Sequence, residues 1–420
     1  MLLEALITLS RAAIGISGLL LIAWAVSSNR WAVNWRIPIA GIIAHLLLAL
    51  FVLKTDSGNW LFYQVGQFFV LLIGFTQAGT AFVFGPFADS DQFGFSVVLS
   101  VLPTIVFFSS LMAVAYHLGL MQWLVRGLAT IIVRLMRVSG AEALSVAANV
   151  FVGQTEAPLV VRPYIPKMTE SELFTLMCGG MATIAGGVLA AYVGVLGGGD
   201  PEAQAQVAKH LIAASLMAAP ATFVMAKIMV PETGNPETLG TVHTTVARTT
   251  HNVIEAAAVG AADGAKLAIN VGAMLLAFLA LLALINYPLQ WFGQWIQFPG
   301  TLDLALLLGY LMAPLAWLVG VPSENVIEVG GLIGQKIVAN EFVAYIQLAE
   351  LQGLSDKAYL IATYALCGFA NIGSVAVQIG GIGGMAPERR TDVSRLGLRA
   401  VLGGTLATLM SATVAGALAT

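Results

Sequence analysis

The sequence predicts an all-α polytopic membrane protein. It is expected to have about eight transmembrane helices, two oppositely oriented re-entrant helical hairpins and interfacial helices, arranged as an inverted repeat. Three observations predict this fold. Of 420 residues, 58% are hydrophobic and only 10% are charged, whereas soluble domains carry about 25% charged residues. Polar clusters interrupt two apolar segments. Two glycine-rich segments far apart in the chain resemble each other.

The predicted spans follow from length, because about 20 mostly apolar residues are needed to cross a bilayer. Eight segments meet this condition: 5–26, 37–54, 95–119, 172–197, 207–230, 267–287, 360–384 and 397–418. The first has no basic start or small-residue cleavage site, so it is interpreted as a membrane helix and not as a removable signal. Residues 60–86 are rich in aromatic residues, Gly and Gln, and are expected to be interfacial.

Charge and cysteine content exclude several classes of function. The net charge of −3 offers no basic patch for nucleic acid. Cys178 and Cys367 both lie in apolar stretches, which argues against a disulfide framework or a zinc site. The five histidines show no metal-ligand spacing, so a membrane enzyme built on a metal is disfavoured.

The charges of the loops predict the orientation of the spans. Arg30 and Arg36 follow the first span and indicate a cytoplasmic loop, which places the N-terminus outside. Asp200 and Asp303 mark loops on the outer side. The pattern is consistent only if 143–166 enters and leaves on the cytoplasmic side and 302–350 does so on the outer side. Both segments are therefore predicted to be hairpins, and the C-terminus is also expected outside.

An internal repeat supports the hairpins. Residues 172–199 and 357–384 align when Cys178 is set on Cys367, which also pairs Gly179 with Gly368. Each copy follows an apolar segment with a polar centre, "VGQTEAPLVV" in the first and "IGQKIVANEFVAYI" in the second. Inverted repeats with broken helices that meet at the bilayer midplane are a common plan of transporters.

The polar clusters indicate a binding site, because an ionised carboxylate at the bilayer centre costs about 2.5–3.5 kcal/mol on insertion scales. Glu156 and Glu341 lie in apolar surroundings, and the cluster also includes Gln154, Thr155, Asn371 and Ser374. Gly153 and Pro158 are expected to unwind the tip of the first hairpin. Carboxylates and amides suit a neutral sugar or base; the opposing interpretation is that these residues only join helices.

A cation site is also indicated. Asn149 precedes the first tip, and Thr183 and Ile184 lie in "GGMATIAGG", where the glycines can loosen the helix. An amide, a hydroxyl and freed carbonyls form a neutral oxygen set of the kind that Na⁺ accepts. Thr183 can equally bond back to its own helix.

At these residues the chain resembles the concentrative nucleoside transporters. The resemblance is carried by "GQTEAPLVVRPY", "GVPSENVIEVGGLIGQKIVANEFVAYIQL" and "CGFANIGSVAVQIGG", and it extends over nearly the whole chain. It implies a homotrimer in the cell inner membrane and a transport domain that moves by an elevator-like step. The implied scaffold comprises residues 1–119 and about 267–287. The first transport repeat then covers 120–266 and the second covers 288–420.

The resemblance also implies roles for individual residues. Gln154, Thr155 and Glu156 would contact the nucleobase side of the substrate, with Val188 on the wall near the base. Glu341, Asn371 and Ser374 would bind the ribose, with Phe369 beside them. The implied sodium ligands are Asn149, Val152, Thr183 and Ile184, with Val152 and Ile184 acting through backbone carbonyls.

The expected function is import of nucleosides such as uridine or adenosine by sodium symport. Proton-coupled relatives tend to carry "GQSEN" at the first tip, whereas this chain has "GQTEAP", as the sodium-coupled branch does. The alternatives are a proton-coupled nucleoside symporter, a sodium-coupled elevator transporter of another small polar solute, and a channel.

Overall fold

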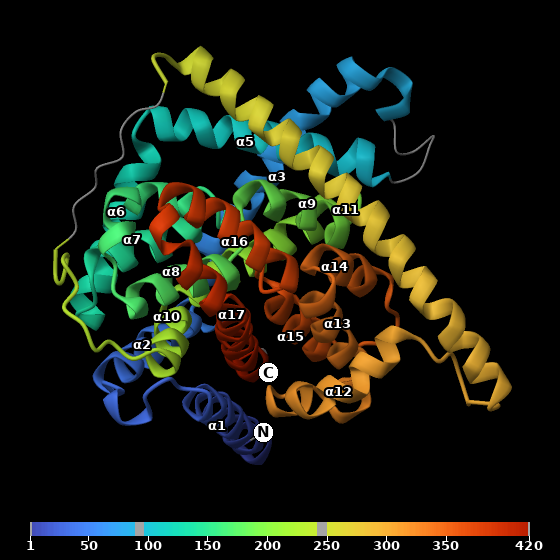
Figure 1. Ribbon diagram of the computed structural model, residues 1–420. Helices are drawn as coiled ribbons and strands as arrows, with labels where there is room; N and C mark the ends of the chain where they lie inside the picture. The colour runs from blue at the N-terminus through green and yellow to red at the C-terminus, as the bar shows by residue number, and fades with distance from the viewer. Residues whose placement is uncertain (1, 89–95, 242–249, 419–420) are drawn as a thin grey trace.

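The computed structural model describes residues 2–88, 96–241 and 250–418 (Figure 1). These residues form helices and no strand. The α-helices are α1 (Leu2–Ala25), α2 (Arg36–Lys54), α3 (Asp56–Phe84), α5 (Leu102–His117), α6 (Leu120–Met136), α7 (Gly140–Asn149), α8 (Glu170–Ala182), α9 (Gly186–Gly197), α10 (Pro201–Met229), α11 (Val253–Trp295), α12 (Leu304–Leu318), α13 (Val326–Val338), α14 (Glu341–Glu350), α15 (Asp356–Leu366), α16 (Ile372–Met385) and α17 (Arg390–Leu418).

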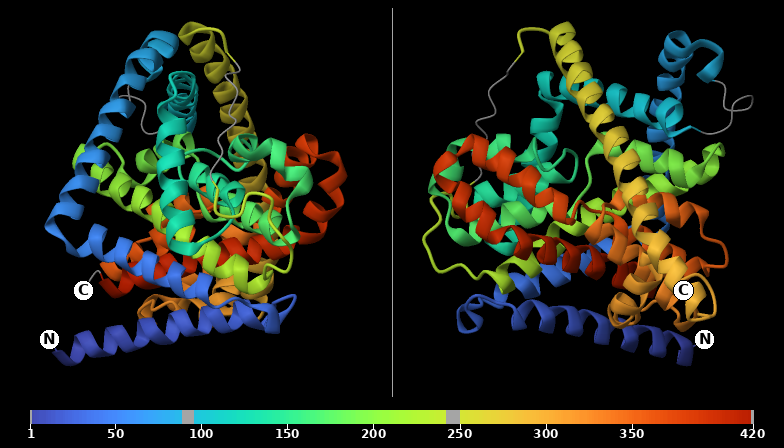
Figure 2. Two further views of the ribbon diagram at one scale, coloured as in Figure 1. Left: turned by 90° about the vertical axis from the view of Figure 1, so that its left-hand side faces the viewer. Right: turned by 45° about the vertical axis from the view of Figure 1, so that its right-hand side comes forward.

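Eight of the described helical segments are long and apolar enough to cross a membrane. Seven of them coincide with predicted spans. The predicted span 360–384 is divided between α15 and α16 by a non-helical stretch, so neither part reaches full length alone. The eighth candidate is α3, which the sequence predicts as interfacial. Figure 2 shows α3 rising steeply from the end of α2, in a direction far from those of α1 and α2.

The first hairpin, hairpin 1, consists of α7 and the 3₁₀ segment Ala157–Lys167. A capping box begins α7, in which Ser139 and Glu142 bond each other's backbone N–H groups. Pro158, Pro163 and Pro166 lack N–H groups and prevent a regular α-helix in the second arm. The chain therefore turns back within the predicted segment 143–166, and the residues of the turn are left outside both arms.

The second hairpin, hairpin 2, is shorter than predicted. Its two arms are α13 and α14, and Asn340 caps α14 by accepting a hydrogen bond from the Val343 N–H at 2.9 Å. The helix α12, which belongs to the predicted segment 302–350, is a separate helix packed along α13. Glycines allow this close approach, since a Cβ at Gly330 would lie 2.8 Å from the Gly309 carbonyl oxygen.

Each hairpin is followed by a broken helix and then by a long helix. In the first repeat α8 and α9 are separated at 183–185 and α10 follows; in the second, α15 and α16 are separated at 367–371 and α17 follows. This is the predicted internal repeat. The register that pairs the cysteines is wrong in detail, because Cys178 lies within α8, whereas Cys367 lies beyond the end of α15.

The longest helix, α11, lies across the rest of the molecule. It has 43 residues and is about 64 Å long, and in Figure 1 it runs diagonally while α17 is seen nearly end-on. It packs on α5 through small residues, since a Cβ at Gly264 would lie 2.7 Å from Ser109 Cβ. Small residues at helix interfaces let backbones approach closely in membranes.

Candidate substrate and ion site

The turn of hairpin 1 presents Gln154 inward. Gln154 is 9% exposed, whereas Thr155 and Glu156 beside it are exposed. Gln154 packs on α8, since a Cβ at Gly180 would lie 2.8 Å from Gln154 Cβ. At Gly153 a Cβ would lie 2.6 Å from Glu156 Oε2, so the Glu156 carboxylate folds back over its own turn.

The turn of hairpin 2 presents Glu341, the first residue of α14. Its buried carboxylate accepts a hydrogen bond from the Tyr192 hydroxyl at 2.8 Å and another from Asn371 Nδ2 at 3.0 Å. Tyr192 is on α9 and also packs against Tyr345, with ring centroids 4.5 Å apart and the rings tilted by 37°. Two donors from two different helices therefore hold the carboxylate in one orientation.

The N-terminus of α16 connects the two hairpins. Asn371 caps this helix by accepting a hydrogen bond from the Ser374 N–H at 2.8 Å. The Ser374 hydroxyl accepts from Gln154 Nε2 at 3.0 Å, and Gln378 Nε2 donates to Gln154 Oε1 at 3.2 Å. A continuous chain of hydrogen bonds thus runs from Gln154 through Ser374 and Asn371 to Glu341. We call this chain the polar bridge.

The other predicted substrate residues lie outside the polar bridge. In the part of the chain that the structure describes, Glu156 and Thr155 form no hydrogen bond to it. Val188 is buried near the start of α9. Phe369 lies in the break between α15 and α16, where its N–H donates to the Thr183 carbonyl at 3.3 Å.

Two of the predicted sodium residues, Asn149 and Thr183, lie beside Gly179 of α8. Asn149 is the last residue of α7 and is 0% exposed. Among the described residues, neither Asn149 Oδ1 nor Nδ2 has a hydrogen-bond partner. A Cβ at Gly179 of α8 would lie 3.5 Å from Asn149 Nδ2. A buried amide normally finds partners, so the unpaired Asn149 oxygen fits a role as a cation ligand.

Thr183 shows the alternative that the sequence leaves open. Its hydroxyl donates to the Gly179 carbonyl at 2.9 Å, within its own helix. That bond uses the proton and leaves lone pairs on the oxygen. Ile184, 1% exposed, and Val152, 7% exposed, complete the predicted set, and both are buried. The predicted ligands are neutral oxygens, the kind that coordinate sodium at the ends of broken helices in transporters.

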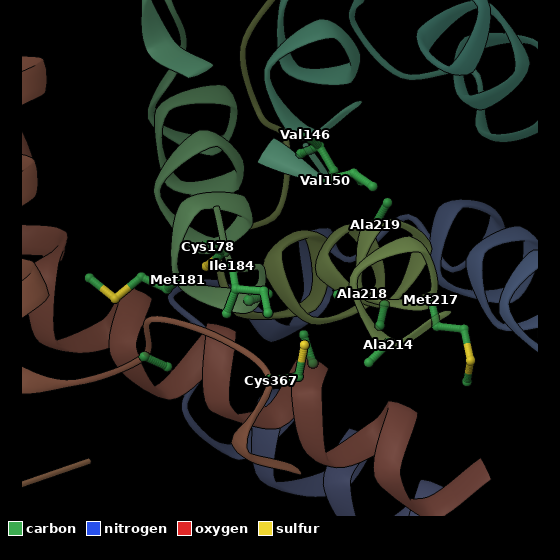
Figure 3. Close-up of a cluster of buried hydrophobic side chains, with 14 of the residues drawn as sticks. Val146, Val150, Cys178, Met181, Ile184, Ala214, Met217, Ala218, Ala219 and Cys367 are labelled. Carbon is green, nitrogen blue, oxygen red and sulfur yellow. The ribbon is translucent and has the colours of Figure 1, made fainter. Parts of the chain in front are cut away.

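Apolar packing behind these residues fixes the two helix breaks. Figure 3 shows Val146 and Val150 from hairpin 1, Ile184 from the first break and Cys367 from the second gathered around α10. All four are buried. The two breaks therefore lie within the close-packed interior of the protein.

Two residues of the site were missed by the sequence interpretation. Gln378 orients Gln154 and also donates to the Met177 carbonyl at 2.9 Å. As a lone amide in the apolar run "VAVQIGG", it carried a usable signal, because such a residue is costly against lipid. Tyr192 gave no comparable signal, since tyrosine is common in apolar helices.

Two mirrored hairpins and two broken helices that share one buried polar bridge define a secondary transporter. A family model described as "Na+ dependent nucleoside transporter C-terminus" matches residues 210–416, and its N-terminal counterpart matches 14–87. A third model, described as "Nucleoside recognition", matches 98–199. The chain belongs to the concentrative nucleoside transporter family. It is a multi-pass membrane transporter and not an enzyme.

Similar proteins cover nearly the whole chain. It is 41% identical to nucleoside permease NupC of Helicobacter pylori over 96% of both chains. It is 40% identical to mouse sodium/nucleoside cotransporter 1, over 96% of this chain and 63% of that protein. The structure of CNTnw in an inward-facing substrate-bound state matches with a TM-score of 0.90 at 44% identity, covering 98% of this chain and 99% of the other.

A CNTnw variant in an outward-facing state matches with a TM-score of 0.91 at 43% identity, over 99% of both chains. The same fold is therefore found in an inward-facing state and in an outward-facing state. Together with the family membership, these structures support nucleoside transport by alternating access.

Proposed function

We propose that this protein imports nucleosides such as uridine or adenosine by sodium symport. Substrate binding is assigned to Gln154, Thr155, Glu156, Val188, Glu341, Phe369, Asn371 and Ser374. Sodium binding is assigned to Asn149, Val152, Thr183 and Ile184. The observation that carries the proposal is the polar bridge, which joins side chains of both hairpins and both repeats.

The chemistry of the polar bridge suits a neutral, hydroxyl-rich substrate. The Glu341 carboxylate can accept hydrogen bonds from ribose hydroxyls, and the Gln154 amide can both donate to and accept from a base. Both groups already have protein partners, so the substrate would exchange for or extend existing hydrogen bonds. Specificity would follow, because a competitor without matching groups would leave buried polar atoms unpaired.

Sodium would couple to the substrate through hairpin 1. Asn149 ends α7, and five residues later Gln154 enters the polar bridge. An ion held by the Asn149 oxygen would order the intervening turn and so place Gln154. By reciprocity, nucleoside should then raise sodium affinity by the same factor.

The energetics suffice with one Na⁺ per nucleoside. Moving one charge inward down 100 mV releases about 2.3 kcal/mol, and a tenfold sodium gradient adds about 1.4 kcal/mol. Since each 1.4 kcal/mol corresponds to a factor of about ten, the two contributions together support roughly several-hundred-fold accumulation of a neutral solute.

The proposal extends to assembly and movement. We assign α1, α2, α3, α5 and α11 to a static scaffold, and the two repeats with their hairpins to a domain that moves in an elevator-like step. A homotrimer in the inner membrane, with both termini outside, completes the proposal. The similarity to CNTnw in inward- and outward-facing states supports the movement.

Uptake of radiolabelled uridine into proteoliposomes tests the proposal. We expect accumulation with an inward sodium gradient and block by excess adenosine, but not by amino acids or dicarboxylates. A pH gradient without sodium is the matched control. Accumulation driven by the pH gradient alone would replace sodium with protons as the coupling ion. Saturation distinguishes all these transporters from a channel.

A further inference from the structure

Lys336 is a buried cation for which the proposed substrate and sodium sites give no role. It lies in α13, the first arm of hairpin 2, and is 0% exposed. Its ammonium donates to the Ala365 carbonyl at 2.8 Å and to the Thr408 hydroxyl of α17 at 3.1 Å. A charge with no path to water is costly unless its hydrogen bonds compensate for the lost solvation.

The Ala365 carbonyl belongs to the last turn of α15, just before the second helix break. The last four carbonyls of a helix have no partner within it. Here each one has another donor. Thr363 accepts from the Tyr345 hydroxyl at 2.8 Å, and Tyr364 accepts from the Cys367 N–H at 3.2 Å. Leu366 accepts from the Gly368 N–H at 2.8 Å, which leaves Ala365 to Lys336.

The first repeat differs at the corresponding place. There the first arm of hairpin 1 ends at Asn149 beside the last turn of α8. In the described residues, no side chain of hairpin 1 donates to the last carbonyls of α8; the bond to Gly179 comes from Thr183 of the break itself. The end of a helix carries about half a negative charge. In the second repeat, the Lys336 ammonium lies at this negative helix end. In the first repeat, the Asn149 amide lies there, and its atoms are neutral and unpaired among the described residues.

We propose that Lys336 is the fixed cation of the second repeat. Its ammonium holds the carbonyl end of α15 and so positions the adjoining Asn371–Glu341 pair, the task that the sodium ion would perform at the end of α8. This comparison rests on the proposed function. Lys336 is thus a positioning residue, and the second break needs no cation from solution. Only the first repeat would bind a cation that exchanges with solution.

A Lys336→Met variant removes the charge and keeps most of the side-chain volume. We expect the Kd for uridine, measured on the purified full chain by calorimetry, to rise at least about tenfold, as loss of a hydrogen bond to a charged group implies. Sodium affinity without uridine should change less than about twofold by the same measure. The control is Lys357→Met, a half-buried lysine at the other end of α15, which should bind as the wild type does.

A Lys336→Ala variant distinguishes positioning from packing. It leaves a space that ethylammonium can enter, so added ethylammonium should lower the Kd for uridine and raise the melting temperature. Potassium chloride at the same ionic strength should do neither, and Lys336→Met should not respond because its side chain fills the space. If ethylammonium restores uridine binding and stability in Lys336→Ala alone, and potassium chloride does not, the charge of Lys336 is required and not only its volume.

Three results would overturn the assignment: wild-type uridine binding by Lys336→Met, no response of Lys336→Ala to ethylammonium, or failure of both variants to reach the membrane even when cells grow with ethylammonium. The last result would mean that Lys336 serves folding alone. Failure of sodium coupling is a separate outcome, because it would show in the wild type, whereas Lys336 is judged by uridine binding.

Discussion

Gln154 Nε2 and Ser374 Oγ lie 3.0 Å apart, although 220 positions separate them in the sequence. The first residue belongs to the turn of hairpin 1, and the second belongs to the first turn of α16 in the other repeat. This bond makes the two halves of the protein share one site. Movement of either hairpin would therefore shift a residue that contacts the same end of α16, Gln154 from hairpin 1 or Glu341 from hairpin 2.

Replacement of Glu341 by Gln tests the ribose contact. Glu341→Gln removes the negative charge and replaces one of the two carboxylate oxygens with an NH₂ donor. Those oxygens accept hydrogen bonds from Tyr192 and Asn371, and ribose hydroxyls would use them as well. We expect the initial rate of uridine uptake to fall by about tenfold to a hundredfold, since hydrogen bonds to charged groups are worth about 1.5–3 kcal/mol. The measurement is uptake into proteoliposomes with equal amounts of protein.

The matched control for this variant is Glu350→Gln at the exposed end of the same helix. It removes the same charge from α14 and should leave uptake unchanged. Normal uptake by Glu341→Gln would defeat the assignment of Glu341 to the substrate.

Replacement of Asn149 by Ala tests the ion site. Because the amide has no partner among the described residues, its removal should not lower the melting temperature in sodium-free buffer. The stabilisation that sodium gives should shrink, and the sodium concentration for half-maximal uptake should rise by about tenfold or more. Thermal melting across a sodium titration measures both effects.

The control is Ser145→Ala, one turn earlier in α7, whose buried hydroxyl also has no partner in the described structure. It should leave the sodium response intact. An equal loss of sodium response in both variants would show that α7 packing, and not the Asn149 oxygen, is responsible.

Displacement of Gln154 tests base recognition. A Gly180→Ala change adds a Cβ 2.8 Å from Gln154 Cβ, which forces the glutamine to move without changing its chemistry. We expect the ratio of adenosine to uridine uptake to change by several-fold, about 1 kcal/mol of discrimination, with little change in the preference for ribose over deoxyribose. Parallel uptake assays with the four nucleosides give both ratios.

Gln378→Leu removes the second partner of Gln154 and should shift the same ratio in the same assays. If both variants change deoxyribose discrimination more than base preference, Gln154 contacts the sugar instead.

Removal of Lys227 tests stability at the base of hairpin 1. Lys227 Nζ lies 2.6 Å from Glu142 Oε2, and both side chains are nearly fully buried. Lys227→Met leaves the buried Glu142 carboxylate without its cation, and the free energy of unfolding should fall by about 3–5 kcal/mol. Adding Glu142→Gln should recover much of that loss. Detergent-solubilised protein and thermal melting provide the comparison.

The exposed pair of Lys167 and Glu237, 3.1 Å apart, is the control. Lys167→Met should cost less than about 1 kcal/mol, as surface ion pairs do. Similar melting temperatures for Lys227→Met and Lys167→Met would contradict the argument from burial.

Much of the fold follows from the sequence because membrane insertion leaves strong local signals. Gly153 and Pro158 indicated the turn of hairpin 1, and the glycines around Thr183 indicated the first break; the structure has both. Long apolar runs indicated seven of the spans. These features are local: the residues that cause each one are the residues that form it.

The remaining features depend on contacts between distant residues. The close packing of α12 along α13 depends on glycines of two helices that meet only after folding. The orientation of Glu341 by Tyr192 depends on a partner 149 positions away. The direction of α3 is set by packing against α10. None of these relationships is present in the local pattern of any one segment.

The hydrogen bond from the Phe369 N–H to the Thr183 carbonyl joins the two helix breaks through main-chain atoms alone. Main-chain atoms are the same whatever side chain is present. Side chains that line the two breaks can thus change, in evolution or in an engineered variant with altered substrate preference. This main-chain bond would still hold the two repeats in the same relative position.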